Sequence, residues 1–306
     1  MINILPSRTE KQSFKNCSLS GFSMPLSITH ASTNTAFASG IWVPNLFTVR
    51  ATLKRWGKET ILFSDNLENV LTTTEIFNPV YEYLKDTSKN ITTLAAGVGV
   101  YATGIIPLEL NFGSVINLMG DDELVVEVTA NPGAFSTTLA NQNSSFMTLD
   151  KKDAIGIEYF TPKVRSEVIP TSAANYGSDL GDNVTRVVLL QLDKTTRLTA
   201  DQVATSFNFV SDRKNSIDTV AEVYARNNAL YADAADAALR VQTLVLHDGA
   251  EVDRCRVDFT FNGANVTASK NFIGSISFET SQMLLARAYG LSDKHKKADL
   301  TKLARG

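Results

Sequence analysis

The clearest pattern of hydrophobic and polar residues lies between residues 48 and 70. Residues 49–54 alternate between apolar and polar side chains, which is the period of a strand with one buried face. Trp56-Gly57-Lys58 is typical of a turn, because glycine takes positive φ values without steric cost. After a second extended run, Asp65 and Glu68 have the spacing of a capping box, so we expect a short helix to begin there.

A similar order of elements recurs about half a chain later. Residues 203–209 alternate between apolar and polar side chains, residues 211–215 are typical of a turn, and a helix is expected from about Ser216. Few residues are identical between the two stretches. The recurrence nevertheless indicates that the chain contains two copies of one fold.

Strands dominate the expected structure on both sides of this repeat. The strand expected at 124–129 corresponds to one at 272–278, at a separation close to that of the other repeated elements. Many strands joined by Gly, Asn and Asp turns favour an all-β protein built from sandwiches or jelly rolls over a doubly wound sheet.

The domain organisation follows from changes in this pattern. Residues 1–40 are rich in Ser, Thr and Asn without a helical period, so we expect an extended N-terminal arm there. The first sandwich is expected over 41–150 and the second over 151–290, with the join inside the loop-rich stretch 134–182. A basic C-terminal tail follows over 291–306.

The composition is that of a globular protein and argues against some partners. Of 306 residues, 43% are hydrophobic and 20% are charged, and the formal net charge of −3 gives no general attraction to nucleic acid. Residues 90–108 carry no charge, but their glycines, threonines and proline suit buried strands better than a membrane span. The N-terminus lacks the pattern of a signal peptide, which favours synthesis in the cytoplasm.

No set of catalytic residues is visible. The three histidines stand in unrelated contexts, and neither a zinc-protease motif nor a phosphate-binding loop occurs. Cys17 and Cys255 are far apart, form no metal or redox motif and are expected to be buried or free thiols. We therefore expect that the chain is not an enzyme.

Two acidic clusters and the tail are the candidate binding residues. Hard oxygen ligands in a loop could hold Ca²⁺, although neither cluster matches a calcium loop and solvated turn acids are the simpler interpretation. The tail is either solvated or an arm that touches an acidic partner or an anionic lipid surface. The acidic candidates are Asp121, Asp122, Glu123, Asp179 and Asp182, and the basic candidates are Lys294, Lys296, Lys297, Lys302 and Arg305.

The order of elements resembles that of a known family. The residues that carry this resemblance are the strand–turn–helix stretch 49–70, its counterpart 203–224, and the segments 96–101 and 120–128. Together they resemble the double jelly-roll major capsid proteins of tailless icosahedral, membrane-containing bacteriophages, of the corticovirus and finnlakevirus types.

The resemblance implies two tandem jelly rolls, each with a short helix, in a structural protein of the virion. Three chains would form a homotrimer of pseudo-hexagonal outline, and these trimers would tile an icosahedral shell over an internal membrane. Partners would be neighbouring capsomers, penton and minor capsid or membrane proteins, and the viral lipid, without specific nucleic-acid binding. No cofactor is carried over, because no motif here matches the Ca²⁺ sites of the family residue by residue.

Two other classes stay open at the level of sequence. A two-domain β-sandwich spike or carbohydrate-binding module would need exposed aromatics or acids grouped in the loops of one face. Trp42 and Trp56 are the only tryptophans, and core packing is the simpler interpretation of both. A jelly-roll hydrolase would need paired carboxylates, which can be distant in sequence.

Overall fold

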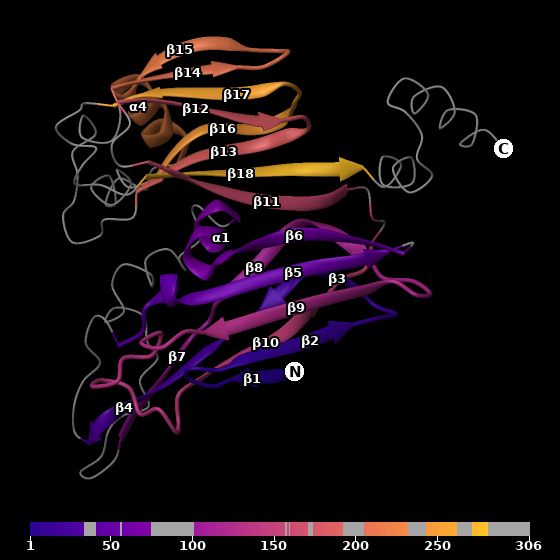
Figure 1. Ribbon diagram of the computed structural model, residues 1–306, viewed down its shortest axis with the longest axis vertical. Helices are drawn as coiled ribbons and strands as arrows, with labels where there is room; N and C mark the ends of the chain where they lie inside the picture. The colour runs from indigo at the N-terminus through magenta and orange to yellow at the C-terminus, as the bar shows by residue number, and fades with distance from the viewer. Residues whose placement is uncertain are drawn as a thin grey trace. The chain divides into compact units, whose positions relative to one another are not determined.

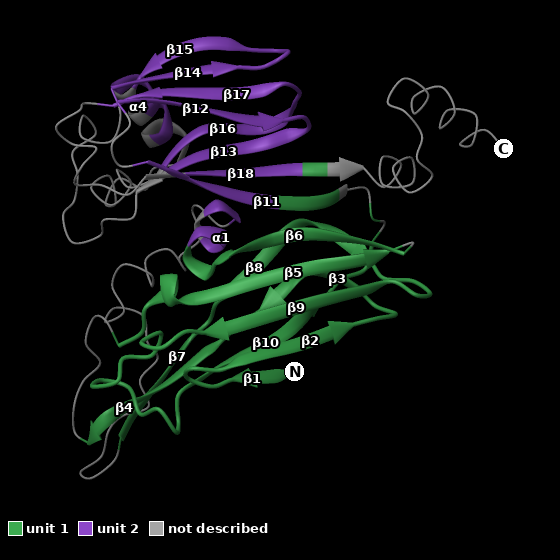
Figure 2. Ribbon diagram, in the orientation of Figure 1, with its two compact units in different colours: residues 1–68, 82–163, 278–306 green, residues 69–81, 164–277 purple. Residues whose placement is uncertain are grey.

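The chain forms two compact units (Figure 2). In this computed structural model, unit 1 comprises residues 1–68, 82–163 and 278–306, and unit 2 comprises residues 69–81 and 164–277. The structure describes residues 1–33, 41–55, 57–74, 101–156, 158, 160–170, 174–191, 205–231, 243–261 and 271–280.

Unit 2 is built from two four-stranded sheets (Figure 1). The first sheet has the order β11 (Phe160–Ile169), β18 (Asn271–Thr280), β13 (Val184–Gln191) and β16 (Thr243–Val252). The second has the order β12 (Asn175–Gly181), β17 (Cys255–Thr260), β14 (Ser206–Val210) and β15 (Asn215–Thr219). With the strands counted from first to eighth along the chain, the sheets read 1-8-3-6 and 2-7-4-5. This interleaving of two Greek keys is the jelly-roll topology.

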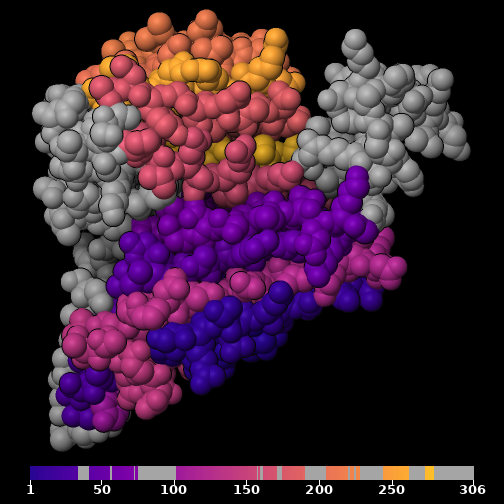
Figure 3. Space-filling view, viewed as in Figure 1, coloured from indigo at the N-terminus to yellow at the C-terminus, as the bar shows by residue number. Residues whose placement is uncertain are grey.

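Unit 1 repeats this order with two of its strands divided. One sheet contains β1 (Ile2–Ile4), β10 (Phe146–Asp153), β4 (Leu26–Thr33), β7 (Tyr101–Ile106), β3 (Ser18–Ser23) and β8 (Glu109–Asn117). The other has the order β2 (Thr9–Phe14), β9 (Glu123–Ala130), β5 (Phe47–Arg55) and β6 (Lys58–Asn66). Because β3 with β4 and β7 with β8 occupy the third and sixth positions, unit 1 is also a jelly roll. Figure 3 displays one face of the β2-β9-β5-β6 sheet, on which strands from distant parts of the chain lie side by side, as their different colours show.

One helix follows the fifth strand of each unit. Helix α1 (Leu67–Thr74) follows β6, and helix α4 (Val220–Tyr231) follows β15. A short 3-10 helix, η1 (Pro44–Leu46), precedes β5. The repeat expected from residues 48–70 and 203–224 is therefore confirmed in its order of elements, and the fold is two tandem jelly rolls.

The helix starts differ from the expected positions. Asp65 lies opposite Val49 in the ladder between β5 and β6, so extended pairing continues past it and α1 begins at Leu67. Ser216 lies opposite Phe209 within β15, and α4 begins only at Val220. In both cases a cross-strand partner holds the chain extended, which the local sequence does not reveal.

Residues 1–33 differ from the expected extended arm. They form β1 to β4, which pair with β10, β9, β7 and β8 in the two sheets of unit 1. The polar composition of this region reflects edge positions, since Thr9, Lys11 and Ser13 point to solvent from β2 at the end of its sheet. The first sandwich therefore includes most of the segment that was expected to precede it.

Each unit has an aromatic cluster inside its sandwich. In unit 1, Phe47 makes edge contacts with Trp42 and Phe135, with ring centroids 6.2 and 5.3 Å apart. In unit 2, Phe207 meets Phe259 edge to face with centroids 5.6 Å apart. All five rings are at most 2% exposed, and burying one such side chain contributes about 1.5–3 kcal/mol.

Candidate functional site

A densely hydrogen-bonded polar group of unit 1 centres on Arg55, the last residue of β5. Its side chain is 9% exposed and lies between Asp122 and Glu158, which are 13% and 7% exposed. Nε donates to Asp122 Oδ2 at 2.8 Å, while Nη1 and Nη2 donate to the two carboxylate oxygens of Glu158 at 2.8 and 3.0 Å. This two-pronged pairing matches the planar guanidinium to a carboxylate. We call these three residues the Arg55 cluster.

The Arg55 cluster joins three segments that are far apart in the sequence. Asp122 lies in the turn between β8 and β9, and Glu158 lies between β10 and β11. Glu158 also accepts hydrogen bonds from the Asn117 backbone N–H at 2.7 Å and from Thr161 Oγ1 at 2.9 Å. Arg55 Nη2 donates to the Asn117 carbonyl at 2.5 Å. The cluster therefore ties two loops of unit 1 to the end of its β5–β6 hairpin.

The electrostatics of this cluster suit a structural role. Burial disfavours the charged guanidinium, but the hydrogen bond to Glu158 and the charges of Glu158 and Asp122 outweigh it, so the pKa of Arg55 lies above its ordinary value. A group that stays cationic at every working pH does not exchange protons with a substrate. The cluster can hold loops in place, and its guanidinium is not suited to acid–base chemistry.

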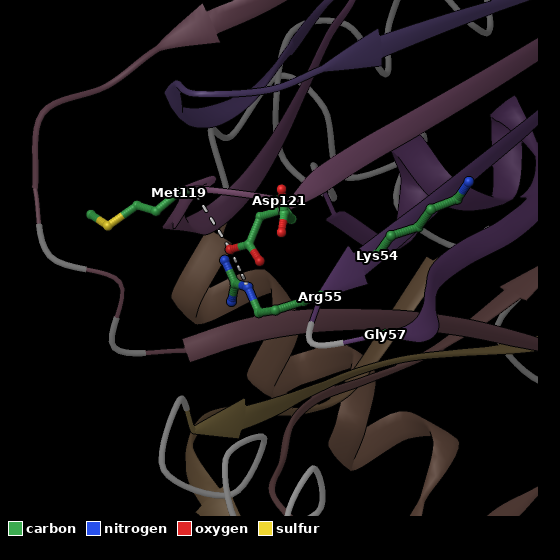
Figure 4. A pocket seen from close by; sticks show the side chains of 6 residues that line it. Lys54, Arg55, Gly57, Met119 and Asp121 are labelled. Atoms are coloured by element: carbon green, nitrogen blue, oxygen red, sulfur yellow. Dashed lines mark hydrogen bonds and ion pairs between the residues drawn. The ribbon is translucent and has the colours of Figure 1, made fainter.

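A pocket of about 590 Å³ lies beside the cluster (Figure 4). Figure 4 shows that Lys54 and Arg55 leave the end of β5 in different directions, with the Asp121 turn next to Arg55. Met119 at the rim is 70% exposed. The lining residues are Lys54, Arg55, Gly57, Met119, Asp121 and Asp122. Charges of both signs line the pocket, and its most buried carboxylate, that of Asp122, is already paired with Arg55.

The first calcium candidate, Asp121-Asp122-Glu123, has carboxylates with separate partners. Asp121 is exposed in the turn, Asp122 faces Arg55, and Glu123 accepts a hydrogen bond from Ser13 Oγ at 2.6 Å. Glu123 also lies 3.5 Å from Lys54 Nζ, and the Ser13 bond together with nearby lysines holds its pKa below the usual range. Protein cations and a hydroxyl thus contact the carboxylates of Asp122 and Glu123, while Asp121 is exposed.

The second candidate, Asp179 with Asp182, helps to hold neighbouring turns. Asp182 Oδ1 accepts the Arg254 backbone N–H at 2.9 Å, and Asp179 Oδ1 accepts that of Gly181 at 3.2 Å. Across the described segments, no three His, Cys, Asp or Glu side chains are grouped as metal ligands. The geometry therefore lends no support to a Ca²⁺ site at either cluster.

The other sequence candidates lie outside the described residues or have structural partners. Lys294, Lys296, Lys297, Lys302 and Arg305 lie outside them, as does Trp56. His247 and Asp248, which are adjacent in the sequence, have different hydrogen-bond partners: His247 Nε2 lies 3.0 Å from the Ala250 carbonyl, and Arg186 Nε donates to Asp248 at 3.0 Å. Burial lowers the pKa of His247.

Sequence reasoning missed both ends of the central ion pair. Glu158 lies in the loop-rich join and Arg55 in the turn region of a hairpin, and 103 positions separate them. One signal was available in the sequence. The buried positions 49, 51 and 53 of the alternating strand are apolar, and the next position of that series is Arg55, where another apolar residue would be usual. Such an Arg requires a buried carboxylate, but its identity depends on the tertiary fold.

Comparison with known proteins shows which solved structures are similar to this fold. No protein-family model matches the chain, and no curated protein sequence matches it. The crystal structure of the STIV MCP, a viral major capsid protein, is similar over 90% of this chain and 93% of that chain, with a TM-score of 0.53 and 14% identity. At this identity the likeness establishes a shared fold.

Two further viral structures are similar at lower scores. The major capsid protein P2 from bacteriophage PM2 covers 90% of this chain and 93% of its own length, with 8% identity and a TM-score of 0.47. The mavirus major capsid protein covers 91% of this chain and 86% of its own length, with 11% identity and a TM-score of 0.36.

Among the described residues, the two α-helices and η1 are too short or too polar to cross a membrane.

Proposed function

We propose that this chain is a major capsid protein that assembles with copies of itself into an icosahedral shell. The observation that carries the proposal is the succession of two complete jelly rolls with one strand order. The STIV MCP, itself a major capsid protein, is similar over 90% of the chain. The protein would then be located in the virion after synthesis in the host cytoplasm.

Two similar sandwiches in one chain support a trimeric building block. Three chains present six similar sandwiches, which gives a homotrimer a pseudo-hexagonal outline that can tile a surface. Permanent interfaces of this kind are large and comparatively apolar. A charged fraction of 20% over the whole chain is compatible with such interfaces.

The polar residues of the described segments also favour a structural role. The Arg55 cluster and the turns around Asp182 hold loops through fixed hydrogen bonds, and their carboxylates have protein partners. Further proposed partners are neighbouring capsomers, penton and minor capsid or membrane proteins. The internal membrane of the virion would meet the basic tail.

The proposal is tested on the purified full-length chain by light scattering and negative-stain microscopy. We expect particles of about 100 kDa, three times the 33.3 kDa chain, with a hexagonal outline. Co-expression with its shell partners should yield closed particles. A chain that stays monomeric and melts at a higher temperature in the presence of a particular sugar would instead support the carbohydrate-binding alternative.

A further inference from the structure

Two edge strands of unit 1 lack the charged residues that the other described edges have, and β7, with six residues against three in β1, is the longer of the two. The four sheets have eight end strands along their paths: β7 and β8, β2 and β6, β11 and β16, and β12 and β15. Outside these paths, β1 is a further edge that pairs only with β10. Among all these described edge strands, only β7 and the three-residue β1 contain no Asp, Glu, Lys or Arg. Charged residues on an edge strand oppose its pairing with another chain. No charged residue of β7 therefore opposes its pairing with another chain.

The outward side of β7 is also apolar. Tyr101 and Ile105 are 47% and 52% exposed, with the half-buried Thr103 between them on the same face. Ala102 and Ile106, on the opposite face, are buried. Large exposed hydrophobic side chains at both ends of an uncharged edge indicate a contact surface more than a solvated one.

The strand next to β7 continues this character. β4 contains no Asp, Glu, Lys or Arg, and its Ser27 and Thr29 lie opposite Ile105 and Thr103 in the ladder. Thr29 and Thr103 are hydrogen-bonded through their hydroxyls at 3.2 Å. A chain that covered β7 and its neighbour would thus bury no unpaired charge, which would otherwise be costly.

We propose that β7 pairs antiparallel with β7 of a second copy of this chain, about a two-fold axis at Thr103. In this register Tyr101 lies opposite Ile105 of the second copy, and Thr103 lies opposite Thr103 of the second copy. Aromatic with β-branched residues and Thr with Thr are favourable cross-strand pairs. The sequence of β7 can therefore pair with itself without charge repulsion and with matched side-chain types, and on this ground we take a second copy as the occupant.

The inference rests on the proposed function, because it assigns β7 to assembly of the shell. A two-fold pairing closes after two copies, so it cannot build a trimer. It would instead link one trimer to the next across the two-fold contacts of a shell. The trimer itself requires another surface.

Cross-linking tests this register directly. We place a Thr103→Cys substitution in a full-length Cys17→Ser background, since the remaining Cys255 is fully buried. A short bis-maleimide should join two chains through position 103, because opposed Cβ atoms lie about 5 Å apart. The matched control is Ile217→Cys in the same background, at a 76% exposed position on the edge strand β15, and it should stay uncoupled.

A charged edge tests the energetics of the pairing. Ile105→Lys and, separately, Tyr101→Lys should weaken two-fold association about tenfold or more in sedimentation equilibrium, with an unchanged melting temperature. Ile217→Lys should leave association as in the wild type. If one of the two lysine variants at β7 has a lowered melting temperature, association is measured on the other variant. The cross-linking experiment gives an independent result.

The outcomes separate the pairing from the shell function. Trimers and particles that form without a cross-link in the Thr103→Cys variant, and persist in Ile105→Lys, overturn the pairing and leave the proposed function intact. A cross-linked two-fold dimer without trimers or particles supports the pairing and counts against the shell. A chain that stays monomeric in every assay overturns both.

Discussion

At the scale of single residues, Arg55 is held in place from several sides. It gives hydrogen bonds to two carboxylates and one carbonyl while almost fully buried. Taking three charged groups out of water is costly, so an ion cluster of this kind contributes little net stability compared with apolar packing. Removing only the arginine should cost much more stability, because the two carboxylates would stay buried without their cation.

Arg55→Met should therefore destabilise unit 1 strongly. We expect a loss of about 3–5 kcal/mol in its free energy of unfolding, since Glu158 and Asp122 would lose a buried partner. Both tryptophans of the chain belong to unit 1, so urea unfolding followed by tryptophan fluorescence reports on this unit.

Lys54→Met is the matched control for that measurement. Lys54 is the neighbouring residue, is 44% exposed and lies 3.5–3.6 Å from its carboxylate partners, so its loss should cost less than about 1 kcal/mol. Equal losses for the two variants would contradict the structural role assigned to the Arg55 cluster.

A second residue-scale feature links the first two strands of unit 2. The Tyr176 hydroxyl on β12 donates to Glu167 Oε1 on β11, and Ser178 Oγ donates to Glu167 Oε2 at 2.6 Å. The hydrogen bond to Glu167, burial and the charge of Glu167 raise the pKa of Tyr176 from 10.0 to about 12. Glu167 thus holds two side chains of the neighbouring strand.

This shift predicts a loss of stability in alkali. In the unfolded chain Tyr176 releases its proton near pH 10, whereas in the folded chain it keeps it to about pH 12. The unfolded state therefore binds fewer protons in this window, and the free energy of unfolding should fall as pH rises from 10 to 12. Urea titrations at several pH values measure this slope. Tyr176→Phe should show a shallower slope, and an unchanged slope would sink the assignment.

At the scale of elements, helix α4 shows how a strand is ended and a helix begun. The Glu222 carboxylate accepts the backbone N–H of Thr219 at 2.8 Å, while Thr219 Oγ1 accepts the backbone N–H of Glu222 at 3.3 Å. This reciprocal arrangement is a capping box, and it satisfies donors that a helix start leaves without partners. It explains why the helix begins at Val220 directly after β15.

Thr219→Ala should loosen the start of α4. The expected cost of losing an N-cap hydroxyl is about 1 kcal/mol. Hydrogen exchange of the α4 backbone, measured by mass spectrometry, should be faster by about fivefold, with β13 unaffected. Thr219→Asp keeps an accepting oxygen at the N-cap and should exchange as the wild type does. If Asp and Ala behave alike, the capping box does not set the helix start.

At the scale of the whole molecule, the repeated order of strands is the dominant feature. Each unit reads 1-8-3-6 and 2-7-4-5, and along the chain a helix follows the fifth strand of each. Each jelly roll has its own aromatic core. Such a chain supplies two similar bodies to an assembly, which is the physical basis of the proposed shell role.

Deletion of residues 293–306 tests the proposed role of the tail within that assembly. The segment has five basic residues against two acidic ones, and each Lys or Arg near an anionic lipid surface contributes about 1 kcal/mol. We expect the shortened chain to form trimers as before but to bind anionic vesicles more weakly in flotation assays. A variant with all five basic residues replaced by Gln controls for length, and normal particles with normal lipid content from both would contradict the proposal.

The sequence by itself determined the class of the fold and its repetition. Alternation over 49–54 and 203–209 identifies strands because side-chain period is a local property. The glycine of the turn after β5 has φ of +70°, a conformation that glycine adopts without steric cost. The order of such local signals, repeated along the chain, sufficed to predict two tandem sandwiches. The expected correspondence of 124–129 with 272–278 was wrong, because β9 is the seventh strand of unit 1 and β18 is the eighth of unit 2.

Tertiary structure alone decided the pairings between distant segments. Polar residues 9–13 become an edge strand because β9 lies beside them, and Ser216 stays extended because Phe209 lies opposite. Asp122 resembled a metal ligand in the sequence, yet its partner is Arg55, 67 positions away. A carboxylate pairs with the cation that the fold brings close to it, and the spacing of residues along the chain does not reveal which cation that is.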